Sequence, residues 1–436
     1  MLVQKNFEVA IIGGGIAGIN LAISLHRRGV PCTIYEKAHA FGEIGAGLGL
    51  TPNATHAMEA CDPDVLRAFE KISQPPLRWD FLDGTTEGAD DKIQFSLGDG
   101  TRGIRGCHRA HFLDELLKLV PEGITRFSKQ LDRVEEPEGP RGRLRMVFRD
   151  GSMAEADAIV GADGIKSHTR GIIVGHDHPS AKPVYTHKYC YRGLLPMNQA
   201  VEIIGRERAF GSNLWAAEKV HMVTYPVALG SICNIVVHCQ GDQDWPSDTL
   251  LTLPADKADL IRDASVFTPR LRKLIKLMKT VDQWGQFDLA SHPVPTFASG
   301  RICLIGDAAH ASTPHQGAGA GMCIEDAATL AELLADDCVR CGADVVAAFA
   351  AYDAARRERG QWLVRTSRDA GELYEFRTEI GRDFEKMGRD VKARAEIVWD
   401  FDIRQSVEEA RKDLRRRLAV EKGAMDYQQG SFRAGL

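Results

Sequence analysis

A glycine-rich turn near the start of the chain has the residue types and spacing of a dinucleotide-phosphate site. Gly13, Gly15 and Gly18 fit the pattern G-x-G-x-x-G in the segment FEVAIIGGGIAGINLAISL. An apolar run over 9–12 predicts a strand before the turn, and apolar residues at helical spacing predict a helix after it. Bare backbone in such a turn can approach a pyrophosphate closely, and the helix N-terminus supplies N–H groups and a partial positive charge. We therefore expect this turn to bind the pyrophosphate of a dinucleotide.

An acidic side chain and more glycines follow this turn. Glu36 ends a second predicted strand over 33–35, where a carboxylate can accept hydrogen bonds from a ribose hydroxyl. The next segment, FGEIGAGLGLTPNA, places Gly47 and Gly49 among apolar residues that suggest ordered packing. A dinucleotide with a wide tricyclic ring needs more close backbone approaches than one with a nicotinamide. The segment therefore favours FAD over NAD.

A second glycine-rich segment, GDAAHASTPHQGAGAG, lies far along the chain at 306–321. Asp307 follows a short apolar run, at the end of a predicted strand, where its carboxylate can reach a ribityl hydroxyl. Pro314 fixes the backbone, and Gly317, Gly319 and Gly321 open a predicted apolar helix. The N-terminus of that helix would stabilise the negative charge of a reduced flavin. We expect both glycine segments to build one FAD site rather than two separate sites.

Taken in order, these motifs resemble those of the class A flavoprotein monooxygenases, the aromatic hydroxylases typified by 4-hydroxybenzoate hydroxylase. The chain carries the glycine motif at 13–18, a DG motif in DAIVGADGIKSHTR and a GD motif at 306–307. The resemblance extends to about residue 370 and implies non-covalently bound FAD. It also implies that Arg109, in CHRAHFLDELL, contacts the cofactor. The residues expected to bind FAD are Gly13, Gly15, Gly18, Glu36, Gly49, Arg109, Asp163, Asp307, Pro314, Gly319 and Ala320.

The same resemblance implies an α/β fold with a Rossmann-like FAD-binding domain of the 4-hydroxybenzoate hydroxylase type. We expect this domain to be discontinuous, over 1–75, 100–175 and 290–365. A DG pair at 150–151 predicts a hairpin within it. The inserted β-sheet substrate domain is expected over 76–99 and 176–289, where apolar and polar residues alternate, and a helical C-terminal region over 366–436.

The implied activity is monooxygenation of an aromatic ring. Segments such as YRGLLP and TPHQGAGAGM are similar to those of salicylate hydroxylases and of related fungal phenol hydroxylases. The resemblance implies that NADH or NADPH visits transiently to reduce FAD, and that O2 then gives a flavin hydroperoxide, while the protein orients the substrate and excludes water. We expect salicylate to be converted to catechol with decarboxylation. Hydroxylation or dearomatisation of a polyketide-derived phenol, and an oxidase or reductase reaction without oxygen insertion, are the alternatives; a non-catalytic FAD-binding sensor is another.

Two residues are expected to contact the substrate. Arg192, in KYCYRGLLP, carries a guanidinium that matches a carboxylate or phenolate better than an ammonium would. In related dearomatising hydroxylases the matching arginine binds substrate, and Tyr225, in VTYPV, matches their substrate-contacting tyrosine. Alternatively, Arg192 pairs with an acid at the sheet edge and Tyr225 packs in the core.

Three histidines are weaker candidates. His310 and His315 lie in the second glycine segment, where packing or backbone bonding is the expected role. His221 flanks the predicted substrate strand and is a candidate proton relay. No cluster of potential ligands has the sequence spacing of a metal site, so we expect no metal.

Composition excludes several other classes of protein. The chain has 436 residues and a formal net charge of −5, which gives no reason to expect a nucleic-acid partner. No apolar run approaches the length of a membrane span, and the strand pattern near the start leaves no room for a signal peptide. Ten cysteines are scattered without C-x-x-C pairs, as expected for reduced thiols. We expect a cytoplasmic monomer or homodimer.

Overall fold

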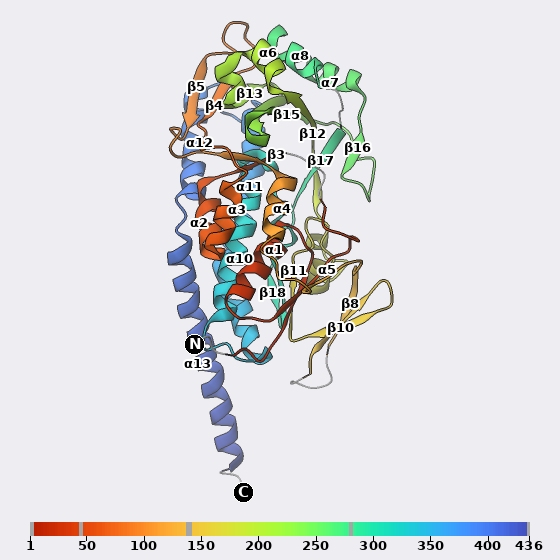
Figure 1. The fold of residues 1–436 in the computed structure, drawn as a ribbon, viewed down its shortest axis with the longest axis vertical. Coiled ribbons are helices and arrows are strands. Elements are labelled where there is room, and N and C mark those ends of the chain that lie inside the picture. Colours follow the sequence, from red (N-terminus) through yellow and green to blue (C-terminus); the bar gives the residue numbers. More distant parts are fainter. Residues whose placement is uncertain (1–3, 43–46, 137–141, 279–281, 434–436) are drawn as a thin grey trace.

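The computed structural model describes residues 4–42, 47–136, 142–278 and 282–433. Its lower half in Figure 1 is built on a six-stranded sheet in which β1 lies between β2 and β11, parallel to both. The strand order is β18 (Ala298–Ser299), β19 (Ile302–Leu304), β11 (Ala158–Gly161), β1 (Val9–Ile12), β2 (Cys32–Tyr35) and β7 (Thr125–Arg126). Only β18 runs antiparallel to its neighbour. Because the central strands are parallel, their carboxyl ends meet at one edge, where ligands bind in such sheets.

Helices and a small sheet cover the two faces of this sheet. On one face α1 (Ile16–Arg27) packs with α10 (Gly319–Ala335) in the main apolar core. On the other face lies a three-stranded sheet, whose inward side chains pack on Ala10, Ile12 and Ile159. Its strands are β8 (Leu131–Glu135), β9 (Leu144–Phe148) and β10 (Met153–Ala156). β9 and β10 pair as the hairpin predicted at 150–151.

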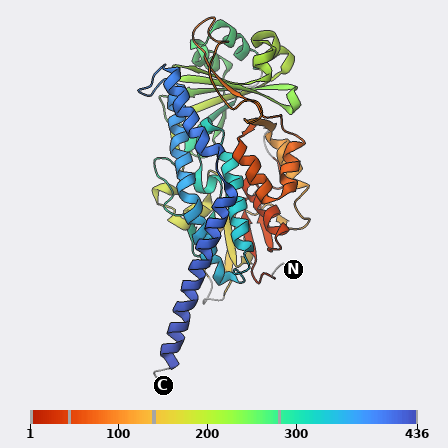
Figure 2. The same ribbon diagram turned by 90° about the vertical axis from the view of Figure 1, so that its left-hand side faces the viewer.

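An eight-stranded sheet lies across the top of the molecule in Figure 2. Its order is β16 (Thr252–Pro254), β17 (Asp282–Asp288), β12 (Val184–Pro196), β15 (Ile232–Gln240), β14 (Val220–Val227), β13 (Ser212–Ala217), β4 (Trp79–Asp83) and β5 (Ile93–Leu97). One face is covered by α6 (Met197–Phe210), α7 (Lys257–Asp263) and α8 (Pro269–Lys276). The other face lies toward the lower half of the molecule.

The remaining elements join the two sheets. A two-stranded ribbon of β3 (Gly47–Leu50) and β6 (Arg105–His108) lies between them. Short helices complete this region: α2 (Pro52–Cys61), α3 (Pro63–Glu70), α4 (Arg109–Leu117), α5 (His168–Val174) and α9 (Asp307–His310). The helix α11 (Gly342–Tyr374) spans both halves and passes residue 365, the expected start of the C-terminal region, without a break.

The C-terminal region is helical, as expected. α12 (Phe384–Trp399) packs against β5, and α13 (Ile403–Arg433) packs along α10 and α11 through a row of apolar residues. That row is Ile403, Val407, Ala410, Leu414 and Leu418. Beyond it α13 continues past the body of the molecule (Figures 1 and 2). Among the described residues, none of the helices combines the length and apolar character needed to cross a membrane.

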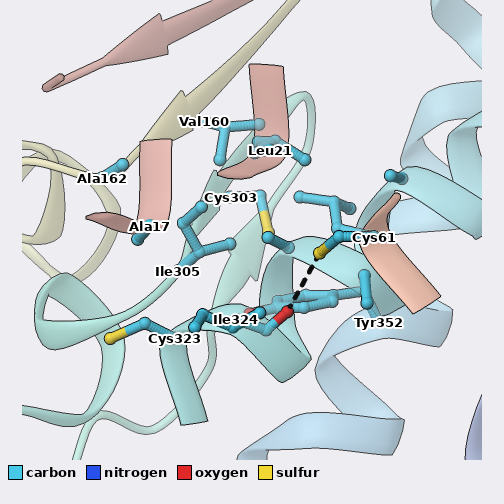
Figure 3. Close-up of a cluster of buried hydrophobic side chains, with 14 of the residues drawn as sticks. Ala17, Leu21, Cys61, Val160, Ala162, Cys303, Ile305, Cys323, Ile324 and Tyr352 are labelled. Atoms are coloured by element: carbon cyan, nitrogen blue, oxygen red, sulfur yellow. Dashed lines mark hydrogen bonds between the residues drawn. The ribbon is translucent and has the colours of Figure 1, made fainter. Parts of the chain in front are cut away.

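Several cysteines are part of the main core, shown in Figure 3. The Cys61 thiol donates to the carbonyl of Ile324 at 3.6 Å, and Cys303 and Cys323 pack in the same cluster. Burial raises the pKa of the Cys61 thiol to about 12. These sulfurs therefore act as small apolar groups rather than as nucleophiles.

Candidate functional site

A cavity of about 210 Å³ opens at the carboxyl ends of β1 and β2. Gly13, Gly15 and Glu36 line it, together with Asp163. The Glu36 carboxylate accepts hydrogen bonds from the backbone N–H groups of Gly14, at 2.7 Å, and Ala38, at 2.8 Å. These bonds fix the carboxylate beside the cavity and leave it lone pairs for a ribose hydroxyl.

Two of the glycines are required by close backbone packing. A Cβ on Gly13 would lie 2.4 Å from the carbonyl oxygen of Ala162, and its φ is +108°. A Cβ on Gly18 would lie 2.1 Å from the carbonyl oxygen of Gly13. By contrast, a Cβ on Gly15 would have no neighbour within 4 Å. Gly13 and Gly18 therefore bring α1 against the turn, and Gly15 presents open backbone to the cavity.

Asp163 makes its hydrogen bonds to α5. Its carboxylate accepts from the N–H groups of His168, at 2.8 Å, and Thr169, at 2.9 Å, and from the hydroxyl of Ser167. A carboxylate at this place stabilises the first turn of a helix. The residue lies at the cavity wall, and its hydrogen bonds position the loop between β11 and α5.

A second cavity, of about 340 Å³, lies between the two halves of the molecule. It shares Gly15, Ala162 and Gly164 with the first cavity, so one elongated molecule can occupy both. The expected FAD-binding residues that line it are Gly15, Gly49, Arg109, Asp307, Pro314, Gly319 and Ala320. The structure thus brings both glycine segments to one site.

The lower wall of this cavity fits a flavin. α10 begins at Gly319, and no side chain caps its N-terminus, so its first N–H groups are available to a ligand. The Asp307 carboxylate, in the first turn of α9, is exposed at the cavity. A helix N-terminus beside the pyrimidine side of a flavin stabilises negative charge on the reduced ring.

The upper wall is one face of the eight-stranded sheet. Antiparallel pairing places Arg192 opposite Val236, and Val236 opposite Val223, so these residues form a middle row across three strands. Side chains two residues along a strand share a face and lie roughly 6.6–6.8 Å apart. One neighbouring row therefore contains Asn234 and Tyr225, and the row on the other side contains His238 and His221. All seven residues line the cavity.

Arg192 lies at one end of the middle row. Its guanidinium carbon is 4.5 Å from the centre of the Trp284 ring, a cation–π contact that holds the side chain at the cavity wall. Its buried Nε has no hydrogen-bond partner among the residues that the structure describes. A donor in this state is available to an anionic ligand. The structure thus places Arg192 at the cavity and gives it no acidic partner among the described ion pairs.

Tyr225 and Asn234 form a polar pair next to β3. A Cβ on Gly47 would lie 2.7 Å from the Tyr225 hydroxyl and 2.8 Å from Cγ of Asn234. Burial raises the pKa of Tyr225, so the phenol stays neutral and can donate a hydrogen bond. The amide nitrogen of Asn234 is buried and has no partner in the described ranges of the chain. This row offers neutral hydrogen-bonding groups to a ligand.

The histidine row meets a third imidazole from below. His221 and His238 stack with ring centres 4.4 Å apart, and His315 lies 5.1 and 5.0 Å from them. Burial lowers the pKa of all three well below the ordinary histidine value, and the nearby Lys188 charge acts in the same direction. The three imidazoles are therefore neutral near pH 7. In the described part of the chain, these three histidines form a group of potential metal ligands. One ring nitrogen from each lies within 4.8 Å of the other two.

Sequence reasoning missed Asn234 and His238 as pocket residues. Asn234 and His238 occupy alternate positions of an otherwise apolar strand, and that alternation is a signal that could have identified both. Sequence spacing could not reveal the histidine cluster, because its members come from β14, β15 and the loop before α10. His310 lies elsewhere: its Nε2 is 2.5 Å from an Asp326 carboxylate oxygen, and it lines neither cavity.

A family model described as an FAD binding domain matches residues 6–367 of the chain. A Monascus ruber protein named FAD-dependent monooxygenase pigN is 44% identical over 432 residues, covering 95% of this chain and 98% of that protein. The chain belongs to the FAD-dependent aromatic hydroxylases. This membership confirms the expected α/β fold and the expected monooxygenase class.

Two further relatives carry salicylate in their names. Salicylate hydroxylase asL1 of Sarocladium schorii is 34% identical over 450 residues, covering 96% of this chain and 93% of that protein. A solved salicylate hydroxylase substrate complex superimposes with a TM-score of 0.80 at 30% identity, covering 93% of this chain and 98% of that one. Both comparisons show similarity in sequence and fold to this chain.

Proposed function

We propose that this FAD-dependent monooxygenase uses NADH or NADPH and O2 to hydroxylate a small phenol that it binds as an anion at Arg192. The reaction consumes one phenol, one O2, one NAD(P)H and one proton, and it yields the hydroxylated phenol, water and NAD(P)+. The observation that carries the proposal is the position of Arg192: its guanidinium lies on the upper wall of the larger cavity, opposite the elements expected to hold FAD.

Bound FAD would supply the oxygen-transfer chemistry, held by Gly15, Glu36, Asp307 and the N-terminus of α10. The protein's own residues do the rest. Arg192 stabilises negative charge on the substrate oxygen, which makes the ring more electron-rich. The neutral Tyr225 hydroxyl and the Asn234 amide orient the ring by hydrogen bonds, and Leu214, Val223 and Val236 exclude water from its face.

Salicylate is the first candidate substrate. Its conversion to catechol consumes NADH, O2 and two protons and releases NAD+, water and CO2. The carboxylate of salicylate would bind the Arg192 guanidinium, and its phenol group would bind one of the neutral rows. The likeness to two salicylate hydroxylases supports this candidate.

A phenol with a neutral carbonyl substituent is the second candidate, and the charge of the cavity favours it. Among the described residues that line the larger cavity, Arg109 and Arg192 are the cationic side chains, and only Arg192 lies on the sheet. One guanidinium balances one negative charge. A phenolate whose other oxygen is a ketone or aldehyde needs no second cation, whereas salicylate with its phenol also ionised carries two negative charges.

A substrate panel separates these candidates. Purified holoenzyme would be mixed with NADH, NADPH or neither and with matched phenols: salicylate, 2,4-dihydroxybenzaldehyde and 2,4-dihydroxyacetophenone. NAD(P)H consumption, O2 consumption, hydrogen peroxide and product mass would be measured together. We expect one phenol to accelerate NAD(P)H oxidation and to be hydroxylated in equal amount. Oxidation that yields only hydrogen peroxide with every phenol would contradict the proposal and indicate an oxidase.

A further inference from the structure

The histidine cluster (His221, His238 and His315) is connected to the surface by a chain of buried charged groups. Nδ1 of His221 lies 3.1 Å from one carboxylate oxygen of Glu375. The other oxygen of Glu375 contacts the Lys188 ammonium, which also lies 3.0 Å from a carboxylate oxygen of Glu372. Glu375 is fully buried, while the side chain of Glu372 is 31% exposed. The contacts therefore run from the cavity to solvent.

The cavity end of this chain is open to a ligand. His315 is 3% exposed, and within the described part of the chain neither of its ring nitrogens has a hydrogen-bond partner. Both buried nitrogens belong to a side chain that lines the larger cavity. Leaving such polar atoms without a partner costs free energy, so a bound group that hydrogen-bonds there would remove a penalty present in the empty pocket.

We propose that the histidine cluster and the chain Glu375–Lys188–Glu372 form a proton-transfer route that ionises a phenol bound at Arg192. The inference rests on the proposed function, because it concerns the same pocket. The histidine row lies two residues along the strands from the middle row that contains Arg192. An aromatic ring that packs on Val236 therefore has one edge near Arg192 and another near the histidines. The route assigns a role to Lys188 and Glu375, which neither FAD nor substrate binding requires.

The transfer balances without any oxidant or reductant. The phenol O–H bond breaks, its electron pair stays on oxygen, and the proton moves to Nε2 of His221, which itself lines the cavity. His221 passes a proton from Nδ1 to Glu375. Glu375 gives a proton to Lys188 as the Lys188 ammonium gives one to Glu372, which releases it to water. The phenolate remains beside Arg192.

The charges around the route suit this direction of transfer. His221 faces Glu375 from α11, Lys188 from β12, His238 from β15 and His315 from the loop before α10. Burial raises the pKa of Glu375 to about 7, opposed by the Lys188 ammonium. A carboxyl group with this pKa can both accept and release a proton near neutral pH.

The route is tested with 4-nitrophenol, whose anion absorbs visible light, and with oxidised holoenzyme in the absence of NAD(P)H. Protonated probe is mixed with enzyme at a pH below the solution pKa of the probe, and the appearance of bound anion is followed in time. We expect Glu375→Gln and Glu372→Gln to slow this appearance at least tenfold while the final anion fraction changes little. A small external base such as formate should restore the rate in Glu372→Gln.

Glu385→Gln is the matched control, because that side chain is 83% exposed on α12 and pairs with Arg389 rather than with a group of the route. Glu372→Gln keeps the test valid if the buried Glu375 variant fails to fold or to retain FAD. Rates within twofold of wild type in Glu372→Gln would overturn the route. A wild-type enzyme that hydroxylates phenols but binds the probe without ionising it would overturn the route and leave the proposed function standing.

Discussion

Arg192 provides the positive charge on the substrate side of the larger cavity, and its role is tested by two substitutions. If Arg192 binds an anion in a pocket partly closed to water, Arg192→Ala removes the partner of that anion. The activation free energy calculated from kcat/KM should then rise by about 2–5 kcal/mol, so kcat/KM should fall. Arg192→Lys should restore only part of this loss, since an ammonium cannot make the same two-point contact. The measurement is kcat/KM for the best phenol of the panel.

FAD content is the control for these variants. Arg192 is on β12, away from the glycine segments, so the ratio of flavin to protein absorbance should stay at the wild-type value. A normal kcat/KM in Arg192→Ala would remove the residue from substrate binding. Loss of FAD would instead make Arg192 a structural residue.

At the scale of single residues, sequence reasoning succeeded where a motif has a fixed local geometry. Gly15 and Glu36 follow from the strand–turn–helix pattern, and the structure places both at one cavity. Asn234 and His238 were missed because a polar residue in a strand has no local signature of a pocket. Their role depends on which face of the sheet is turned toward the other half of the molecule, and that is decided by long-range packing.

At the scale of elements, the β3 ribbon supports the polar pair of the substrate pocket. A Cβ on Gly47 would overlap the Tyr225 hydroxyl and the Asn234 side chain. Gly47→Ala should therefore displace these groups and weaken phenol binding by about 1–3 kcal/mol, the usual cost of overpacking a well-packed site. Phenol dissociation constants, measured by flavin absorbance changes, check this expectation.

Gly42→Ala is the matched control in the same segment, because a Cβ on Gly42 would have no neighbour within 4 Å. It should bind phenol as wild type does. Equal phenol affinity in Gly47→Ala and Gly42→Ala would show that the ribbon does not position Tyr225 and Asn234 for the substrate.

Most elements of the glycine motifs could be predicted from local pattern. The strands predicted at 9–12 and 33–35 and the hairpin at 150–151 occur, and so does the helix opened by the glycines at 317–321, which begins at Gly319 in the structure. The extent of α11 could not be predicted, because its helical pattern continues past the end of the family resemblance. The partner of α13 could not be predicted either, because an amphipathic helix can pack on its own chain or on a second subunit. In the structure it packs on α10 and α11.

At the scale of the whole molecule, the buried histidines make stability depend on pH. The pKa values of His221, His238 and His315 are held well below the ordinary value in the folded protein, so below about pH 6.5 the unfolded chain binds more protons. Their contribution to stability is therefore present above that pH and is lost as the pH falls. Glu375 acts in the opposite sense, since its raised pKa gives stability that is lost as the pH rises through about 7.

Because three histidines oppose one carboxyl group, the melting temperature should fall when the pH is lowered from about 7.5 to about 5.5. His315→Asn should remove one buried imidazole and lessen this acid destabilisation by about 1 kcal/mol per pH unit below 6.5. His292→Asn, at an exposed histidine, is the control and should keep the wild-type dependence. An unchanged pH dependence in His315→Asn would contradict a buried neutral His315.

The arrangement of the two sheets around one cavity followed from the family resemblance rather than from local pattern, because it depends on strands that are far apart in sequence. In the eight-stranded sheet β4 pairs with β13, although β13 follows β4 by more than a hundred residues in the chain. This arrangement places Arg192 opposite the glycine segments, and it is the basis for assigning oxygen transfer to a phenol in this cavity.

The most direct test of that assignment is the fate of isotopically heavy O2 during turnover with NAD(P)H and the phenol that most accelerates its oxidation. We expect the phenolic product to gain one heavy oxygen atom and to form in an amount equal to the NAD(P)H consumed. Recovery of all heavy oxygen as hydrogen peroxide, with no labelled product, would contradict monooxygenation in this cavity.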